Sequence, residues 1–246
     1  MKFCAASAGA GGEGLEQAFA SLALTTTDAA NRITTDTDTN TRPTLPRQPS
    51  SNDLPTIHLA MRKLREALLA TRRRDPFAQR AYKFLIHAAL LTRSWEAYHP
   101  ALLYLLHHIH PVTPLSRPEV KEFVGYLVLD LACRQYELGE AFRVRREWGL
   151  RDRKVDGAVG ALVQDDWVRF WRLRRAVDGY QRAVMGFAVE RVRVHALKCL
   201  GRGYLSVERG FVERAADGSW EELVKGGVGW ELGDDGRVVI RRVKAK

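Results

Sequence analysis

The stretch YLSVERGFVERAADGSWEELVKGGVGWELGDDGRVVIRRV, residues 204–243, decides the fold class. It opens on Tyr204–Val207, which is short and apolar enough to form a strand. Two short helical segments follow, at Glu208–Ala215 and at Ser219–Lys225. Ser219 favours a helix start, because its hydroxyl can accept a hydrogen bond from a backbone N–H of the first turn.

The end of the same stretch predicts a β-hairpin. Val228–Leu232 and Arg237–Val243 are rich in strand-forming residues, and Gly233–Gly236 provides a four-residue turn between them. A strand, two short helices and a hairpin in this order are typical of a winged helix. We therefore expect residues 201–246 to form a winged-helix domain that carries a small β-hairpin.

Upstream of this domain, residues 53–200 contain one helix signal after another. Aspartate or serine caps the free N–H groups of a first turn, and proline fits its geometry, so these residues predict where helices begin. Ser116 and Glu119 have the spacing of a capping box, and Pro100 predicts the start of a third helix. The predicted helix starts are Asp53, Asp75, Pro100, Ser116, Glu137, Asp152, Asp165 and Gly179.

The apolar faces of these helices predict how they pack. In the second helix the residues at helical spacing are Phe77, Ala81, Phe84 and Ala88. The last helix, Gly179–Leu200, is long and apolar on two sides, one through Tyr180 and Val194 and the other through Val192, which predicts neighbours on both. Short links predict antiparallel pairs stacked in a row, although no exact repeat period is visible. The expected fold is an all-α helical-repeat array, 53–200, followed by the winged helix.

The composition restricts the compartment and the partners. Residues 1–52 are dominated by polar residues in their second half and predict a disordered tail. The net charge of +10 favours acidic partners. The three cysteines are far apart in the sequence, and we find no secretory signal and no apolar stretch of membrane-spanning length. We therefore expect a soluble protein of the cytoplasm or nucleus, with no membrane partner.

Catalysis, metals and cofactors are not predicted. His107 and His110 share a helix face but have no carboxylate at ligand spacing, and closing a helix C-terminus explains them. The glycine-rich run Gly9–Gly14 follows no strand, so a phosphate cradle is not expected. Asp165 and Asp166 suit a helix start, and no opposing acid–base group is evident. We therefore expect no enzyme activity, no cofactor and no metal.

Two sets of side chains allow alternative interpretations. Trp167, Phe170 and Trp171 have the spacing of a buried stripe, although a partner groove would use the same residues. Arginine-rich segments suit either the solvated outer face of a helical stack or a surface that binds nucleic-acid phosphates. The candidate nucleic-acid-binding residues are Arg145, Arg146, Arg153, Lys154, Arg172 and Arg175.

Three segments resemble the PCI domain, which is shared by the proteasome lid, the signalosome and translation initiation factor three. They are EFVGYLVLDLACRQYELGEAF at 122–142, ALVQDDWVRFWRLRRAV at 161–177, and VRVHALKCLGRGYLSV with GWELGDDGRVVIRR near the C-terminal end. The resemblance covers roughly residues 53–246. It fits the small subunits of these assemblies (signalosome subunit eight, its lid counterpart and the k subunit of the initiation factor), and also the Sac-three/GANP type of messenger RNA export and processing.

The resemblance implies a non-catalytic scaffold or adaptor that binds other PCI-domain subunits through its winged helix and its helical stack. The expected partner-binding residues are Trp230, Val238, Ile240 and Arg241, on a final strand whose edge could pair with another sheet. The alternative is a Sac-three/GANP-like adaptor that binds RNA through the arginine-rich segments. Glu221 and Glu222 on the second short helix would repel phosphates, so sequence-specific DNA binding is not expected.

Overall fold

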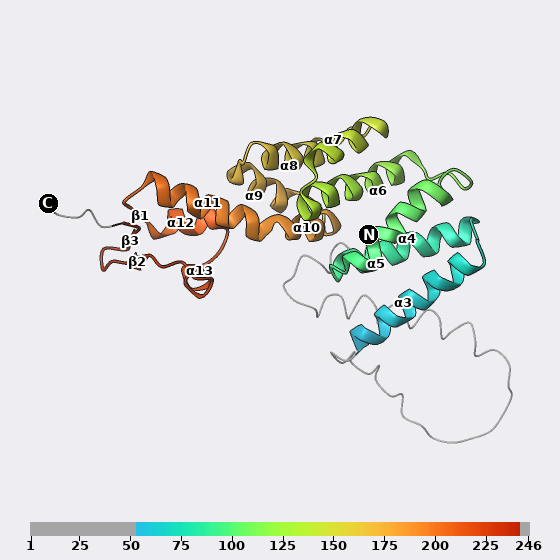
Figure 1. Cartoon of the computed structure of the whole chain (residues 1–246), viewed down its shortest axis with the longest axis horizontal. Helices are drawn as coiled ribbons and strands as arrows, with labels where there is room; N and C mark the ends of the chain where they lie inside the picture. The colour runs from blue at the N-terminus through green and yellow to red at the C-terminus, as the bar shows by residue number, and fades with distance from the viewer. Residues whose placement is uncertain (1–52, 242–246) are drawn as a thin grey trace, which may run out of the picture. The chain divides into compact units, whose positions relative to one another are not determined.

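A computed structural model describes residues 53–241 as mostly helical, with a small three-stranded antiparallel sheet near the C-terminal end (Figure 1). The chain divides into two compact units between Leu115 and Ser116, so the predicted boundary at residue 200 lies inside the second unit. The predicted tail, including its glycine-rich run, and residues 242–246 lie outside the described residues.

The first unit is a group of packed helices. Asp75 begins the second of them as predicted, because its carboxylate accepts from Ala78 N at 2.9 Å while Pro76 occupies the first turn. The core contains Tyr82, whose ring stacks on Tyr104 with centroids 5.0 Å apart. The elements are α3 (Asp53–Ala70), α4 (Pro76–Leu91), α5 (Trp95–Tyr104) and the π-helix η1 (Leu105–Ile109).

The buried face of α4 differs from the predicted one. Phe77 is 45% exposed and Phe84 is 36% exposed, so these two aromatic residues face the surface. The buried stripe is displaced by one residue along the helix and contains small side chains, which let α4 approach its neighbours closely. Ala88 is buried as predicted, and the other buried residues of α4 are Ala78, Gln79, Tyr82, Leu85, Ile86, Ala89 and Leu90.

Pro100 lies inside α5 and does not open it, contrary to the prediction. A proline within a helix has no N–H for the carbonyl four residues earlier, here that of Glu96. Arg65 of α3 supplies donors at this place, with Nη1 at 3.3 Å from Ala97 O and 3.5 Å from Glu96 O. A side chain distant in sequence therefore compensates for the proline.

The second unit continues with helices that pack side by side. α6 contacts α7, α8 and α10, and α8 packs along α9. A Cβ added at Gly157 in α8 would lie 2.9 Å from Leu173 Cδ1 of α9, so the absence of a side chain there permits the close approach. The elements are α6 (Arg117–Asp130), the π-helix η2 (Leu131–Gln135), α7 (Leu138–Glu147), α8 (Arg153–Val163) and α9 (Trp167–Ala176).

Two local predictions in this unit can be compared directly. The capping box at the start of α6 is confirmed, with Ser116 N donating to Glu119 Oε2 at 2.9 Å. The predicted long helix is interrupted, because residues 186–188 form a 3₁₀ turn after Met185. It becomes α10 (Gly179–Met185), η3 (Gly186–Ala188) and α11 (Val189–Gly203).

The interruption changes which faces of the predicted long helix are buried. In α11 only one stripe is buried, and it contains Val192, Ala196 and Leu200. Val194, predicted to face a neighbour, is 37% exposed. Leu197, also predicted on that face, is half-buried against the core that contains Leu200, so the second face is buried only in part.

The sheet lies beyond α11. Its strands have the order β1-β3-β2 and are antiparallel, with Val238 opposite both Val207 and Leu232 (Figure 1). The predicted first strand and both short helices are present within a residue or two of their expected bounds. The elements are β1 (Ser206–Glu208), α12 (Arg209–Ala216), α13 (Trp220–Lys225), β2 (Glu231–Leu232) and β3 (Arg237–Val239).

Candidate functional site

The C-terminal helices and strands, residues 204–241, form a small module with its own core, which we call the terminal module. Leu200 of α11 belongs to the same core, and Trp167 of α9 and Leu197 of α11 pack against it. The module is therefore built directly on α9 and α11. Its buried residues are Val207, Val212, Ala215, Ala216, Trp220, Leu223 and Val238.

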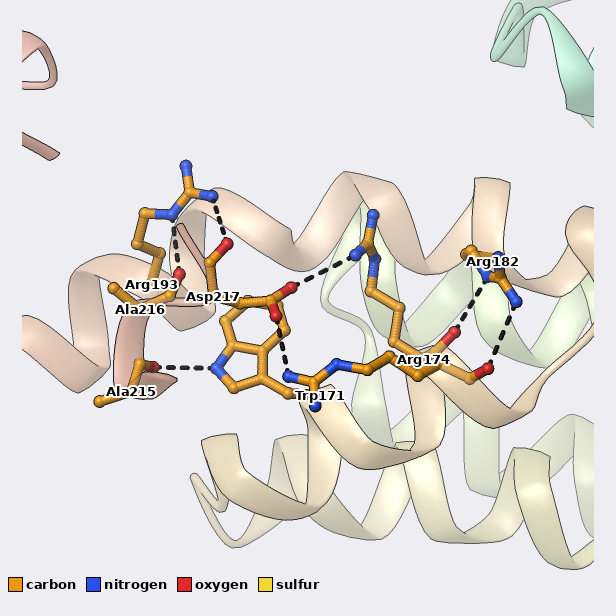
Figure 2. A network of polar contacts seen from close by, with 8 residues as sticks. Trp171, Arg174, Arg182, Arg193, Ala215, Ala216 and Asp217 are labelled. Atoms are coloured by element: carbon orange, nitrogen blue, oxygen red, sulfur yellow. Dashed lines mark hydrogen bonds and ion pairs between the residues drawn. The ribbon is translucent and has the colours of Figure 1, made fainter. Parts of the chain in front are cut away.

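Polar contacts fix the end of α12 against α9 and α11 (Figure 2). The last carbonyls of a helix lack partners within the helix. Here Trp171 Nε1 donates to Ala215 O at 2.9 Å, and the Trp171 side chain is almost fully buried. Arg193 donates from Nε to Ala216 O at 3.0 Å and from Nη2 to Asp217 O at 3.2 Å. Three consecutive carbonyls are thus bound by side chains of two other helices.

Asp217 adds its carboxylate to these contacts. Arg175 Nη2 donates to Asp217 Oδ1 at 2.9 Å, and Arg174 Nη1 approaches Oδ2 at 3.4 Å. Asp217 has φ of 49°, a left-handed conformation that commonly ends helices and that aspartate tolerates better than most residues. We call Trp171, Arg174, Arg175, Arg193 and Asp217 the α12 latch.

A second polar group joins the two short helices of the module. The Glu213 carboxylate accepts two hydrogen bonds, from Arg209 Nε at 2.9 Å and from the backbone N–H of Trp220 at 2.9 Å. These bonds lower the pKa of Glu213. Ser219 caps α13 as predicted, in a capping box with Glu222. Glu213 therefore connects the end of one short helix with the start of the next.

The residues predicted to bind a partner do not form a surface. Val238 is fully buried in the module core, and β3 is the central strand, so neither its side chain nor a free edge is available. Trp230 and Ile240 are half-buried against the same core. Arg241 is exposed, but its guanidinium donates to Arg202 O at 2.9 Å. The strand pattern did not reveal that β3 is paired on both sides, by β1 as well as by β2.

Three exposed apolar residues of the module lie at or near β1, whereas Val224 on α13 and Leu232 on β2 are exposed singly. Tyr204 is 47% exposed, Leu205 is 51% exposed and Phe211 is 39% exposed. The rings of Tyr204 and Phe211 meet edge to face with centroids 6.3 Å apart. β1 is hydrogen-bonded to β3 on one side only, so its other side is an edge of the sheet.

The six predicted nucleic-acid-binding residues fall into two groups. Three have partners within the protein: Arg145 pairs with Asp156, Arg175 with Asp217, and Lys154 Nζ donates to Ala176 O at 2.7 Å. The side chains of the other three are exposed and contact no partner among the described residues. These three are Arg146, Arg153 and Arg172.

The aromatic stripe and the acidic pair lie close together on α9. Phe170 and Trp171 are buried, which confirms the prediction of core packing for them, whereas Trp167 is half-buried. Asp166 caps α9 by accepting from Arg169 N at 2.9 Å. Across residues 53–241, no three His, Cys, Asp or Glu side chains are grouped as metal ligands would be.

No protein-family model matches the chain, and no curated protein matches its sequence. Within the described part of the chain, none of the helices combines the length and the apolar content needed to cross a lipid bilayer.

Proposed function

We propose that the chain is a scaffold or adaptor subunit of a PCI-containing multiprotein complex, of the signalosome, proteasome-lid or initiation-factor type. A succession of helices along the chain, followed by two short helices and a three-stranded sheet, supports this proposal. The resemblance of residues 122–142 and 161–177 to PCI segments supports it as well. In this proposal the module is a winged helix and the preceding helices are the helical repeats.

The observation that carries the proposal is the exposed apolar group of Tyr204, Leu205 and Phe211 beside the free edge of β1. An edge strand presents unpaired N–H and C=O groups, and a partner strand can bind them. Apolar side chains next to such an edge gain about 25 cal/mol for each Å² that a partner covers. The latch supports this role, because a module that is held firmly against α9 and α11 loses little freedom when it binds.

Affinity purification of the full chain tests the proposal. The intact protein should co-purify with other PCI-domain subunits, and Leu205→Asp together with Phe211→Asp should abolish this. The matched control is Val112→Asp, since Val112, 58% exposed, is more exposed than Leu205 or Phe211 and lies in the other unit. A monomeric protein that co-purifies with no such subunits would contradict the proposal, as would equal loss of partners in the control.

A second candidate function is an RNA adaptor of the Sac-three/GANP type. The uncommitted Arg146, Arg153 and Arg172 favour it, and Arg146 also lines a surface hollow of about 300 Å³ with Phe142 and Arg151. Single-stranded RNA should then bind with an affinity that falls steeply with salt. Arg146→Glu with Arg172→Glu should remove this binding, whereas Arg62→Glu should not. Absence of RNA binding at low salt would eliminate this candidate.

A further inference from the structure

A pocket of about 210 Å³ opens within the second unit, and none of its lining residues belongs to the apolar group beside β1. Three parts of the chain line it: the end of η2, the turn between α8 and α9, and the first half of α11. Its inner wall is apolar and includes the buried Leu162 and Phe170. The rings and charged groups that line it are Tyr136, Trp167, His195, Arg191, Asp165 and Asp166.

The volume of the pocket limits what can occupy it. Sites for drug-sized ligands and cofactors have volumes of about 300–1,000 Å³. An apolar cavity of about 150 Å³ accommodates a benzene ring. The pocket therefore has room for one large side chain or one substituted ring, and it is too small for a nucleotide-sized cofactor. Because Trp167 and Tyr136 line it, an aromatic or large aliphatic group is the best match to the lining.

The charged groups around the pocket are not equally available to a ligand. Arg191 stacks on Tyr136, with its Cζ at 3.9 Å from the ring centroid, and donates from Nη2 to Cys133 O at 3.2 Å. It is thus committed to the protein itself. Asp166 caps α9, whereas Asp165 is exposed and its carboxylate contacts no partner among the described residues. Arg191 keeps its positive charge, so with Asp165 and Asp166 the formal charges of the lining are one positive and two negative, and the carboxylate without a partner is that of Asp165.

The backbone on both sides of the pocket is held in an uncommon conformation. Tyr136 has φ of 61° and Asp165 has φ of 53°, and both are left-handed conformations that non-glycine residues rarely adopt. The Arg191 stack holds Tyr136 in place, and the hydrogen bond from Asp166 N to Ala161 O, at 2.9 Å, closes the turn that contains Asp165. Both residues stand where a helix ends, η2 at Tyr136 and α8 just before Asp165, and a left-handed residue is common at such ends, as at Asp217.

We propose that this pocket is a docking site for a partner polypeptide that inserts one aromatic or large aliphatic side chain next to a lysine or arginine. The inserted side chain packs between Trp167 and the apolar wall, and the basic group pairs with Asp165. The site is separate from the apolar residues beside β1, so its existence does not depend on the function proposed above.

Short blocked peptides bound to the full chain test this proposal, with NMR shifts of the Trp167 indole N–H as the readout. A peptide with a central Lys-Phe pair should bind more tightly than the same peptide with Glu-Phe, and a Lys-Ala peptide should not bind measurably. Asp165→Asn should weaken binding of the Lys-Phe peptide about threefold, as expected for an exposed ion pair. The same variant should not weaken binding of the Glu-Phe peptide. Asparagine tolerates the same left-handed conformation, so the variant should keep its fold.

The control is Asp234→Asn, because Asp234 is also an exposed carboxylate without a partner among the described residues and lies in the hairpin turn. Asp234→Asn should change neither the affinity for the Lys-Phe peptide nor that for the Glu-Phe peptide. The proposal is overturned if no peptide shifts the Trp167 resonance, if the Glu-Phe peptide binds best, or if the two aspartate variants behave alike. Phenethylamine, an aromatic ring with an ammonium group, separates the two possible sources of ligand. Binding of this amine without binding of any peptide would indicate a small-molecule site and would also overturn the proposal.

Discussion

Replacing Arg193 by methionine tests whether the α12 latch holds the terminal module in place. Arg193 donates to Ala216 O at 3.0 Å and to Asp217 O at 3.2 Å, and its side chain is 24% exposed. Its ion pair with Glu190 is long, at 3.4 Å, and that glutamate is 74% exposed, so the pair contributes little. Methionine keeps the apolar stem of the side chain and removes both hydrogen bonds.

The expected loss follows from these contacts. Hydrogen bonds from a charged donor contribute about 1.5–3 kcal/mol each in mutational series. The two bonds share one guanidinium, and water can reach part of the site, so they should not add fully. We expect Arg193→Met to destabilise the terminal module by about 2 kcal/mol. This corresponds to a roughly 30-fold increase in the population of the opened module.

Native-state hydrogen exchange measures this opening residue by residue. The amides of α12 and β3 should exchange about 30-fold faster in Arg193→Met, whereas those of α4 in the first unit should not change. The matched control is Arg202→Met, on the same helix, because the Arg202 side chain is exposed and has no partner among the described residues. Acceleration below about twofold, or equal acceleration in both variants, would refute the assignment of the latch.

Three further outcomes are expected. Arg65→Met should destabilise the first unit by about 1 kcal/mol in urea unfolding, because the carbonyls beside Pro100 lose their donor, while Arg62→Met should have little effect. Hydrogen bonds from arginine lower the native pKa of Glu213 and of Glu140, so the native state binds fewer protons than the unfolded state. The urea concentration at the unfolding midpoint should therefore decrease as the pH is lowered from about 5 to about 3. Burial raises the pKa of Cys133 to about 12, so iodoacetamide at pH 8 should leave this thiol unlabelled until the protein unfolds, as peptide mass spectrometry would show.

Local signals in the sequence predicted local structure well. The cap at Asp75, the capping boxes at Ser116 and Ser219, and the order of elements from residue 204 all depend on side chains within a few residues of the backbone that they bind. Such interactions can be inferred from spacing alone. Pro100 was misplaced because the group that compensates for it, Arg65, lies 32 residues from Ala97.

The partner-binding surface was harder to predict, because it depends on which strand of the sheet is paired on both sides and which strand is at the edge. The alternation in residues 237–242 is equally compatible with an edge strand and with a central one. In the structure, Val207 of β1 pairs with Val238 of β3, 31 residues away, and Val238 is fully buried, whereas Leu205 and Phe211 near β1 are exposed. The same limitation applies to the pocket, since Tyr136, Asp165 and Arg191 are brought together only by the packing of three helices.

The excess of basic residues has a structural cause as well as a functional interpretation. Many helices of the second unit are short, and each leaves carbonyls without partners at its C-terminal end, where the helix dipole also favours cations. Basic side chains from other segments bind these carbonyls repeatedly. They are Lys154 at Ala176 O, Arg182 at Arg174 O and Val177 O, Arg191 at Cys133 O, and Arg193 at Ala216 O.

These contacts change how the net charge of +10 should be interpreted. An arginine that binds a helix end is required by the fold, so reversing its charge would unfold the protein locally and imitate a loss of binding. Arg146, Arg153 and Arg172 have no such role among the described residues. A binding defect that follows charge reversal at these three positions can therefore be attributed to a lost partner, and the same defect at Lys154 cannot.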